Sequence, residues 1–191
     1  MVYEAPEYHP AFEEYCETIF ELAEDDFDVI QARIAERLDI SRPAVSEMIR
    51  RMEKEGLVSI DDAGISLTGD GQDIAVSVVR RHRLAERMVV DLLGLELQKS
   101  HIEAHRLEHA ISPQLEEKIV SKLGNPTTCP FGHPIPGSGH RPRMDSIALA
   151  SAGPGQTVVV DRIPEDDQAL LEYFVANKLV PGQAVVVKET A

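Results

Sequence analysis

The sequence lacks tryptophan altogether, and its 191 residues include two cysteines, Cys16 and Cys129. Two cysteines so far apart cannot supply the disulfide framework that stabilises small secreted proteins. No stretch approaches the roughly 18 consecutive apolar residues that span a bilayer. The opening sequence MVYEAPEYHP also lacks the basic and apolar regions of a signal peptide. We therefore expect a cytoplasmic protein that has no membrane partner.

Positive charge is also scarce, since 19 Lys and Arg residues stand against 33 Asp and Glu residues, for a formal net charge of −14. This balance argues against contact with nucleic-acid phosphates, unless the basic residues are gathered on one face or the carboxylates are gathered at a cation site. The apolar content of 43% is enough for a hydrophobic core. The length allows two small domains, or one domain with an appendage.

Three helices are predicted in the first third of the chain. Apolar residues recur at helical spacing in residues 11–24, 29–38 and 41–55. Ser41 is suited to cap the third helix, and the first turn of that helix tolerates Pro43.

A β-hairpin is predicted directly after these helices. Residues 57–60 and 65–68 are short β-type runs, and the sequence Asp-Asp-Ala-Gly joins them. Helices followed by a hairpin in this order are typical of a winged helix-turn-helix DNA-binding domain. The alternative interpretation is a helical module whose charged face is an ordinary solvated surface.

The third helix is the expected recognition helix, because such a helix enters the major groove by its N-terminal end. We expect Arg42, Ala44 and Ser46 to read base edges. Arg50 is better placed for phosphate, and the backbone N–H groups at the start of the helix add a second phosphate site. The residues predicted to bind DNA are Ser41, Arg42, Pro43, Ala44, Ser46 and Arg50.

The middle of the sequence predicts a helical domain. A long amphipathic helix covers residues 72–93, and a second helix covers residues 97–110. A third begins after Ser112 and Pro113 and ends at Gly124. These apolar helices exceed what a small winged domain needs, so we expect them to form a dimer interface.

The last part of the sequence predicts a small β-rich domain. Proline and glycine are frequent in the segment before it, which is typical of a linker. A Pro-Gly-Gln sequence precedes each of the apolar runs 157–160 and 184–187, and a helix is predicted between them at 165–177. Because two strands cannot close a barrel, we expect this domain to be incomplete. The predicted domains are 1–72 for DNA binding, 73–124 for dimerisation and metal binding, 125–144 as a linker, and 145–191 as the β-rich domain.

Side chains of the metal-ligand type occur one or two helical turns apart on one face of the helix predicted at 97–110, and again on the helix before it. A single buried histidine is usually a structural residue, but several histidines in register with carboxylates predict a metal site. The residues in this pattern are His82, Glu86, His101, His105, Glu108 and His109.

Part of this pattern also spells H-x-x-E-H, the inverted zinc-peptidase signature. In that interpretation His105 and His109 would hold zinc, and Glu108 would be the general base of a hydrolase. It gives no role to the other ligand-type residues or to the winged domain, so we expect no enzyme. A further alternative is a metal-independent helix-turn-helix regulator whose histidines are structural.

The sequence resembles the diphtheria toxin repressor family, which includes iron-dependent and manganese-dependent regulators. The motifs that carry the resemblance are ARIAERL (32–38), VSEMIRRMEKEGLV (45–58), RRHRLAER (80–87), HIEAHRLEHAIS (101–112) and PFGHPIPG (130–137). The resemblance implies a mainly helical fold with small β elements: a winged helix-turn-helix domain, a helical dimerisation domain and a C-terminal SH3-like domain. It also implies a homodimer that binds operator DNA when loaded with metal, represses metal-homeostasis genes and has no small organic substrate.

The resemblance further implies two metal sites in each protomer. An ancillary site would take His82, Glu86, His101, Glu165 and Gln168, and an activating site would take Glu14, Glu17, His105, Glu108 and His109. An ion that joins the first helix to the dimer core would set the spacing of the two recognition helices to successive major grooves.

Departures from the family pattern bear on the metal. Iron-type members tend to place Met and Cys where this chain has Glu14 and His105, whereas manganese-type members place carboxylates at both positions and a further acid at Glu17. Oxygen and nitrogen ligands without sulfur favour Mn(II) or Fe(II) as the cofactor. Cys16 lies off the face of Glu14, so we expect it to be a small buried apolar residue rather than a ligand.

Overall fold

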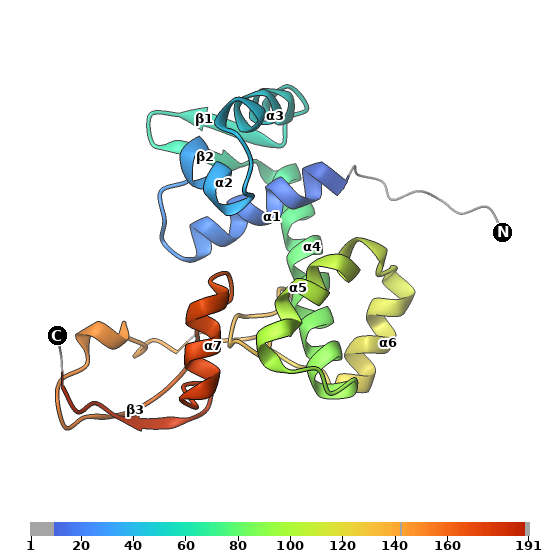
Figure 1. Cartoon of the computed structure of the whole chain (residues 1–191). Coiled ribbons are helices and arrows are strands. Elements are labelled where there is room, and N and C mark those ends of the chain that lie inside the picture. Colours follow the sequence, from blue (N-terminus) through green and yellow to red (C-terminus); the bar gives the residue numbers. More distant parts are fainter. Residues whose placement is uncertain (1–9, 142, 190–191) are drawn as a thin grey trace. The chain divides into compact units, whose positions relative to one another are not determined.

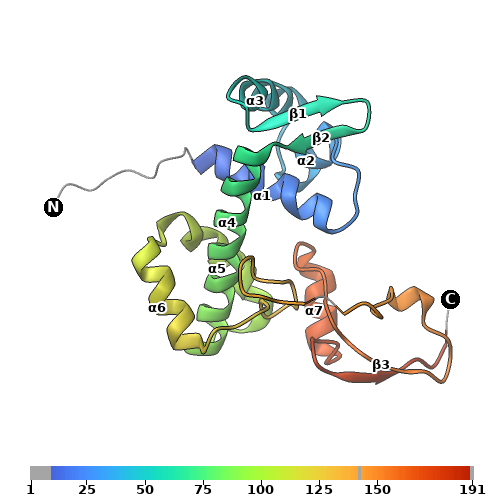
Figure 2. The same cartoon turned by 180° about the vertical axis from the view of Figure 1, so that it is seen from behind.

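The computed structural model describes residues 10–141 and 143–189. The chain forms two compact units, of which the first ends at Val79 and the second begins at Arg80 (Figure 1, and from behind in Figure 2). Residues 1–9, on which the predicted lack of a signal peptide depends, lie outside the described part. Within the described part, no helix is both long enough and apolar enough to cross a membrane. The fold is mainly helical with small antiparallel sheets, as predicted.

The first unit contains the predicted helices and hairpin. Its elements are α1 (Pro10–Glu24), α2 (Gln31–Arg37), α3 (Arg42–Lys54), β1 (Val58–Asp61), β2 (Gly64–Leu67) and the first part of α4 (Gly69–Arg87). The two strands pair antiparallel and reach further into the predicted loop than expected, because Asp61 pairs with Gly64. The Oδ1 atom of Asp61 accepts a hydrogen bond from the N–H of Ala63 at 2.8 Å, which closes the short turn.

The start of α3 is capped as the sequence predicts. Oγ of Ser41 accepts a hydrogen bond from the N–H of Ala44 at 3.4 Å, and proline occupies the first turn. One face of the helix is buried through Val45, Ile49 and Met52. Each such side chain contributes about 1.5–3 kcal/mol when it leaves water. This burial directs the opposite face of α3 to solvent.

Helix α1 packs its apolar side into the same core, where Cys16 is fully buried beside Ile19 and Ile34. Burial, with a smaller contribution from the charge of Glu13, raises the pKa of the Cys16 thiol to about 12. The thiol is therefore an uncharged apolar group. The expected burial of Cys16 is confirmed.

The second unit begins with the last two turns of α4. It continues through a π-helical turn (Met88–Leu92), α5 (Leu97–Leu107), a 3₁₀ turn (Glu108–Ala110) and α6 (Pro113–Leu123). The sequence predicted uninterrupted α-helix at both turns. The π turn widens the end of α4, so that the N–H of Leu93 bonds to the carbonyl of Met88 at 3.2 Å. The 3₁₀ turn tightens the chain after α5, because the N-cap of α6, Ser112, follows almost at once.

The C-terminal part of this unit contains β3 (Thr157–Val159), α7 (Gln168–Ala176) and β4 (Ala184–Val186), with β3 antiparallel to β4. The assignment of this part to an SH3-like domain stays a prediction. Within the segment predicted as a linker, Cys129, Phe131 and Ile135 are buried. Cys129 and Phe131 pack with Ile163 and Leu171, so the segment supplies part of the core of this unit.

A glycine in this segment has no room for a side chain. Gly132 has a φ of +96°, and a Cβ atom there would lie 2.2 Å from the carbonyl oxygen of Asp161. Next to it, the carbonyl of Phe131 accepts a hydrogen bond from the N–H of Ile163 at 3.0 Å. Gly132 therefore lets two backbone segments approach closely.

We expect Gly132→Ala to lower the free energy of unfolding by about 1–3 kcal/mol, because the clash adds to the strain of the left-handed backbone. The matched control is Gly139→Ala, which has a φ of +74° but nothing within 4 Å of the added Cβ. Urea unfolding followed by circular dichroism measures both changes. Equal losses for the two variants would contradict the close-approach argument.

Candidate metal centre and DNA-binding surface

A first group of potential metal ligands joins three parts of the second unit. It consists of His82 and Glu86 on α4, His101 on α5 and Glu165 before α7, whose ligand atoms all lie within 4.8 Å of one another. Nε2 of His82 is 3.1 Å from Oε1 of Glu86 and 3.1 Å from Nδ1 of His101. The two α4 residues are one turn apart, so both face α5. We call this set the first group.

A second group lies on the other side of the His82 ring. Nδ1 of His82 is 2.5 Å from Oε2 of Glu108, which accepts its hydrogen bond. Nδ1 of His105 and Nε2 of His109 lie 3.1 and 3.2 Å from Oε1 of the same carboxylate. We call His82, His105, Glu108 and His109 the second group. The sequence assigned His82 to the ancillary site alone, whereas the structure places its ring in both groups.

Both groups contain a carboxylate that is charged although it is fully buried. Burial by itself would raise the pKa of Glu86, but the charge of His82 and hydrogen bonds from His82 and His101 lower it well below its usual range. For Glu108, burial is outweighed by hydrogen bonds from His105 and His82, and the pKa falls to about 2. Negative charge is therefore fixed among imidazoles inside the protein.

The donor set fits a divalent cation. Among the residues that the structure describes, none gives a hydrogen bond to Oε2 of Glu86, although this atom is enclosed. A buried carboxylate oxygen without a partner is costly, and a cation would remove that cost. Imidazole nitrogens and carboxylate oxygens are the ligands used by manganese, iron and zinc.

Other predicted ligands lie outside these groups or in the first unit. Gln168 is exposed at the start of α7, and its Nε2 donates to Oε1 of Glu172 at 2.9 Å. On α1 in the first unit, Glu17 is buried and Glu14 is half-buried. Glu14 and Glu17 belong to the first unit and the two groups belong to the second, so the assignment of Glu14 and Glu17 to the activating site stays a prediction.

Two residues near the first group were missed by the sequence argument. Oδ1 of Asp166 is 3.9 Å from Nε2 of His101, and Sγ of Cys129 is 3.8 Å from Oε2 of Glu165. The acidic run around 165–167 was a weak signal for Asp166. Nothing in the spacing of Cys129 indicated its position.

The H-x-x-E-H motif does not lie on one continuous α-helix. Helix α5 ends at Leu107, and Glu108 opens the 3₁₀ turn. A general base must reach a water molecule, but the Glu108 side chain is fully buried and accepts a hydrogen bond from His82. This geometry suits a ligand better than a base.

The arginines of the motif at 80–87 hold the second unit together. Arg80 pairs with Glu116 on α6 at 2.6 Å, Arg83 donates to the carbonyl of Pro134 at 2.5 Å, and Arg87 donates to the carbonyl of Thr128 at 2.7 Å. These bonds tie α4 to α6 and to the segment at 128–136. Their basic charges are therefore used inside this unit.

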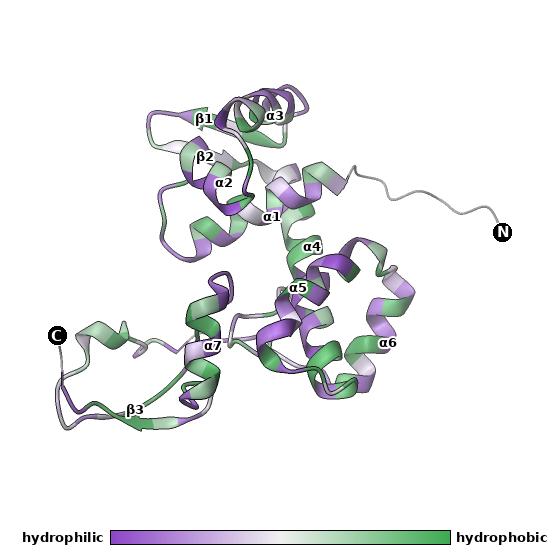
Figure 3. Ribbon diagram, in the orientation of Figure 1, coloured by the Kyte–Doolittle hydropathy of each residue, from purple (hydrophilic) through white to green (hydrophobic). Residues whose placement is uncertain are grey.

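Helix α3 presents the predicted DNA-binding residues to solvent, and in Figure 3 much of its ribbon has the colour of hydrophilic residues. Arg42, Pro43, Ala44 and Arg50 are exposed, Ser41 is exposed at the cap, and Ser46 is half-buried. Nearby basic residues are engaged elsewhere, since Arg37 pairs with Glu21 at 2.9 Å and Arg51 lies 5.0 Å from the centre of the Phe12 ring. Among the described residues, Arg42 and Arg50 have no acidic partner within salt-bridge distance. They are available for phosphates and bases.

Comparison with known proteins relates both parts to one family. Residues 8–63 match the family model of the iron dependent repressor N-terminal DNA binding domain, and residues 68–137 match that of its metal binding and dimerisation domain. The iron-dependent repressor IdeR of Mycobacterium tuberculosis is 41% identical over 192 residues, which cover 93% of this chain and 84% of that protein. The chain belongs to the iron-dependent repressor family.

Other members of the iron-dependent repressor family are similar in sequence and in structure. The diphtheria toxin repressor of Corynebacterium diphtheriae is 45% identical over 151 residues, which cover 77% of this chain and 64% of that protein. A solved manganese-dependent transcriptional repressor in complex with manganese has a TM-score of 0.85 at 34% identity and covers 94% of this chain and 84% of that chain. The predicted family is confirmed, and the comparisons do not favour the hydrolase. Glu165 lies outside the regions matched by the two family models.

Proposed function

We propose that the chain is a repressor that binds Mn(II) or Fe(II), one ion at each of the two groups in a protomer, and then binds operator DNA as a homodimer to control metal-homeostasis genes. The observation that carries this proposal is the burial of two charged carboxylates, Glu86 and Glu108, among histidines. Both lie in the part of the chain that matches the metal binding and dimerisation domain.

The ligands favour manganese or iron as the bound metal. In the proposal His82, Glu86, His101 and Glu165 hold the ancillary ion, with Gln168 as a predicted further ligand. His105, Glu108 and His109 hold the activating ion, with Glu14 and Glu17 as predicted further ligands. The ions supply positive charge that neutralises the buried carboxylates. Nitrogen and oxygen donors suit Mn(II) and Fe(II), and relatives are named for both metals.

A neutral imidazole can bind an ion through one nitrogen and donate a hydrogen bond through the other. In His82, the Nδ1–H donates to Glu108, which leaves Nε2 facing the ligands of the first group. An ion held by Nε2 would fix the Nδ1–H on Oε2 of Glu108. Oε1 of Glu108 would then be turned to His105 and His109. The two sites are thereby linked through one ring.

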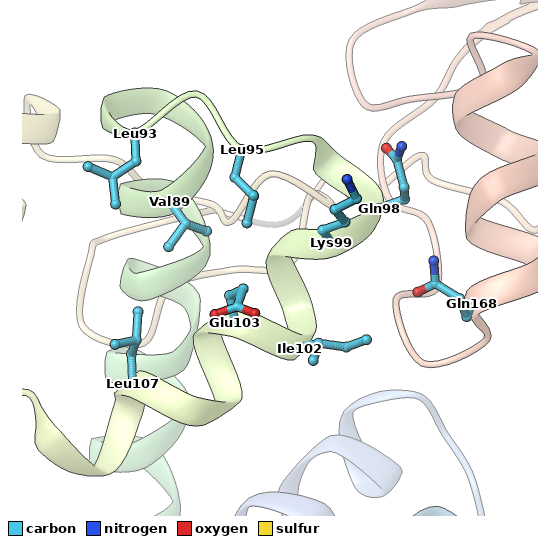
Figure 4. A pocket seen from close by; sticks show the side chains of 9 residues that line it. All are labelled: Val89, Leu93, Leu95, Gln98, Lys99, Ile102, Glu103, Leu107 and Gln168. Atoms are coloured by element: carbon cyan, nitrogen blue, oxygen red, sulfur yellow. The ribbon is translucent and has the colours of Figure 1, made fainter.

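An apolar surface of the second unit supports the homodimer. Leu93 and Ile102 are exposed and line a pocket of ≈ 410 Å³ between α5 and the segment that follows α4 (Figure 4). Val89, Leu95 and Leu107 line the same pocket. Exposed apolar patches of this kind mark interaction surfaces. We propose that a second copy covers it, because the matched domain is a dimerisation domain.

The proposal also covers the cellular location and the C-terminal domain. We propose that the protein acts in the cytoplasm, because its proposed partner is operator DNA. The hairpin of β3 and β4 with α7 is assigned to an SH3-like domain, which would contribute Glu165, and Gln168 as the predicted further ligand, to metal binding.

The proposal is tested by titrating operator binding with metal. A DNA fragment enriched from a random pool by the manganese-loaded protein is labelled, and fluorescence anisotropy is measured with Mn(II), Fe(II), Co(II), Zn(II) or a chelator. We expect Mn(II) or Fe(II) to strengthen binding by at least about tenfold, which corresponds to about 1.4 kcal/mol. Binding of undiminished strength after exhaustive chelation would contradict metal control.

A further inference from the structure

Cys129 lies beside the first group, on a turn with a firmly held backbone. Its N–H donates to the carbonyl of His133 at 2.8 Å, and its own carbonyl accepts hydrogen bonds from the N–H of Gly132 at 3.0 Å and from Nη2 of Arg87 at 3.1 Å. The side chain is fully buried. The thiol is thus held in a fixed place, although 36 residues separate it from Glu165.

The thiol faces the carboxylates of the first group. Sγ of Cys129 donates a hydrogen bond to Oε2 of Glu165 at 3.8 Å. Burial raises the pKa of the thiol well above its usual range, and the charges of Glu86 and Glu165 raise it further.

A cation in the first group would lie close to this thiol, which contacts Glu165. The enclosed Oε2 of Glu86, to which no described residue gives a hydrogen bond, indicates that positive charge is missing at this place. A bound divalent ion is the largest local charge, and it deprotonates a thiol that coordinates it. Sulfur is a soft ligand that favours zinc, cobalt and iron over manganese.

We propose that Cys129 is a further ligand of the first group and binds as a thiolate when Zn(II), Co(II) or Fe(II) occupies it. The S–H bond breaks, the proton passes to solvent, and a sulfur lone pair binds the ion. The thiol makes this group prefer these ions to Mn(II) more strongly than nitrogen and oxygen ligands alone would. The inference rests on the proposed function, since it requires that the first group binds metal.

The neighbouring histidine does not compete for this role. Nε2 of His133 is 3.2 Å from the carbonyl oxygen of Ile163, to which it donates a hydrogen bond, and 3.9 Å from Oε2 of Glu165. Its ring is therefore engaged with the backbone carbonyl of Ile163. Cys129 brings the softest donor to the first group.

Cobalt spectroscopy tests the proposal. The full-length protein is titrated with Co(II), and thiolate coordination is expected to give an intense sulfur-to-cobalt charge-transfer band in the near ultraviolet, together with the visible bands of bound cobalt. The charge-transfer band should be lost in Cys129→Ser and in His101→Gln. It should persist in His105→Gln, which alters the second group, and in Cys16→Ala, the matched control for the other cysteine of the sequence.

Competition titrations measure the effect on selectivity. We expect Cys129→Ser to weaken Zn(II) and Co(II) binding at the first group by about tenfold, and to change Mn(II) binding much less. Thermal unfolding of the metal-free variant checks that it folds. The charge-transfer band of the wild-type protein tests thiolate coordination without any variant.

The outcomes separate the inference from the function on which it rests. Visible cobalt bands that depend on His101 but lack the charge-transfer band would overturn the role of Cys129 and leave the metal-dependent repressor intact. In that case the thiol only donates a hydrogen bond to Glu165. If no cobalt, zinc or manganese binds to the wild-type protein, the proposed function and this inference fail together.

Discussion

The variant His82→Gln is expected to lose metal-activated operator binding by more than about 100-fold, or about 2.7 kcal/mol. Both ring nitrogens of His82 are used, Nε2 toward Glu86 and His101 and Nδ1 toward Glu108. This one substitution therefore removes a member of both the first group and the second group. Glutamine keeps a neutral side chain that can form hydrogen bonds, so the buried carboxylates retain a donor.

The comparison variant is His101→Gln, which removes a ligand from the first group alone. We expect it to keep the activating ion and to lose less DNA affinity than His82→Gln. Calorimetry counts the ions bound, and anisotropy on operator DNA measures the affinity. If His82→Gln and His101→Gln lose the same ion and the same affinity, the linkage of the two groups through His82 is wrong.

Removing the guanidinium groups of α3 is expected to weaken operator binding in two different ways. Arg42→Ala should cost about 1–3 kcal/mol on the preferred operator and relax the choice of one base, if Arg42 reads a base edge. Arg50→Ala should weaken binding to all sequences alike and lower the salt dependence by about one phosphate contact. Both residues are exposed and lack an acidic partner among the described residues.

The control for these variants is Arg106→Ala on α5, because Arg106 is exposed and pairs with Glu103 at 2.5 Å. Affinities are measured at several salt concentrations on the operator and on a scrambled sequence, always with saturating Mn(II). Unchanged affinity in both α3 variants would exclude α3 as the reading helix. An equal loss in Arg106→Ala would show that general charge, and not the α3 surface, controls binding.

The sequence predicted most of the metal groups, because helical spacing determines which side chains share a face. His101 and His105 on α5, and His82 and Glu86 on α4, could be paired in this way. The double use of His82 could not be predicted, because it depends on how α4 and the turn at Glu108 pack together. The approach of Cys129 to Glu165 depends on tertiary structure across 36 residues, which no local pattern reveals.

The elements of the first unit were also predictable, because their apolar residues recur at helical spacing and Ser41 caps α3. The π turn at Met88–Leu92 and the 3₁₀ turn at Glu108–Ala110 were not, because both result from the constraints of neighbouring helices rather than from residue preference. Burial of the Pro- and Gly-rich segment at 128–136 was missed for a related reason. Its frequent prolines and glycines are typical of a linker, although Cys129, Phe131 and Ile135 alternate along it and enter the core.

The sequence has 33 Asp and Glu residues against 19 Lys and Arg residues, for a formal net charge of −14, and three of the arginines, Arg80, Arg83 and Arg87, form bonds inside the second unit. A negatively charged protein is repelled by DNA phosphates over most of its surface, so we expect weak binding to random sequences. We therefore expect little of the protein to be bound to DNA outside its operators. A small change in the concentration of metal-loaded protein would then change the occupancy of the few DNA sites that it recognises.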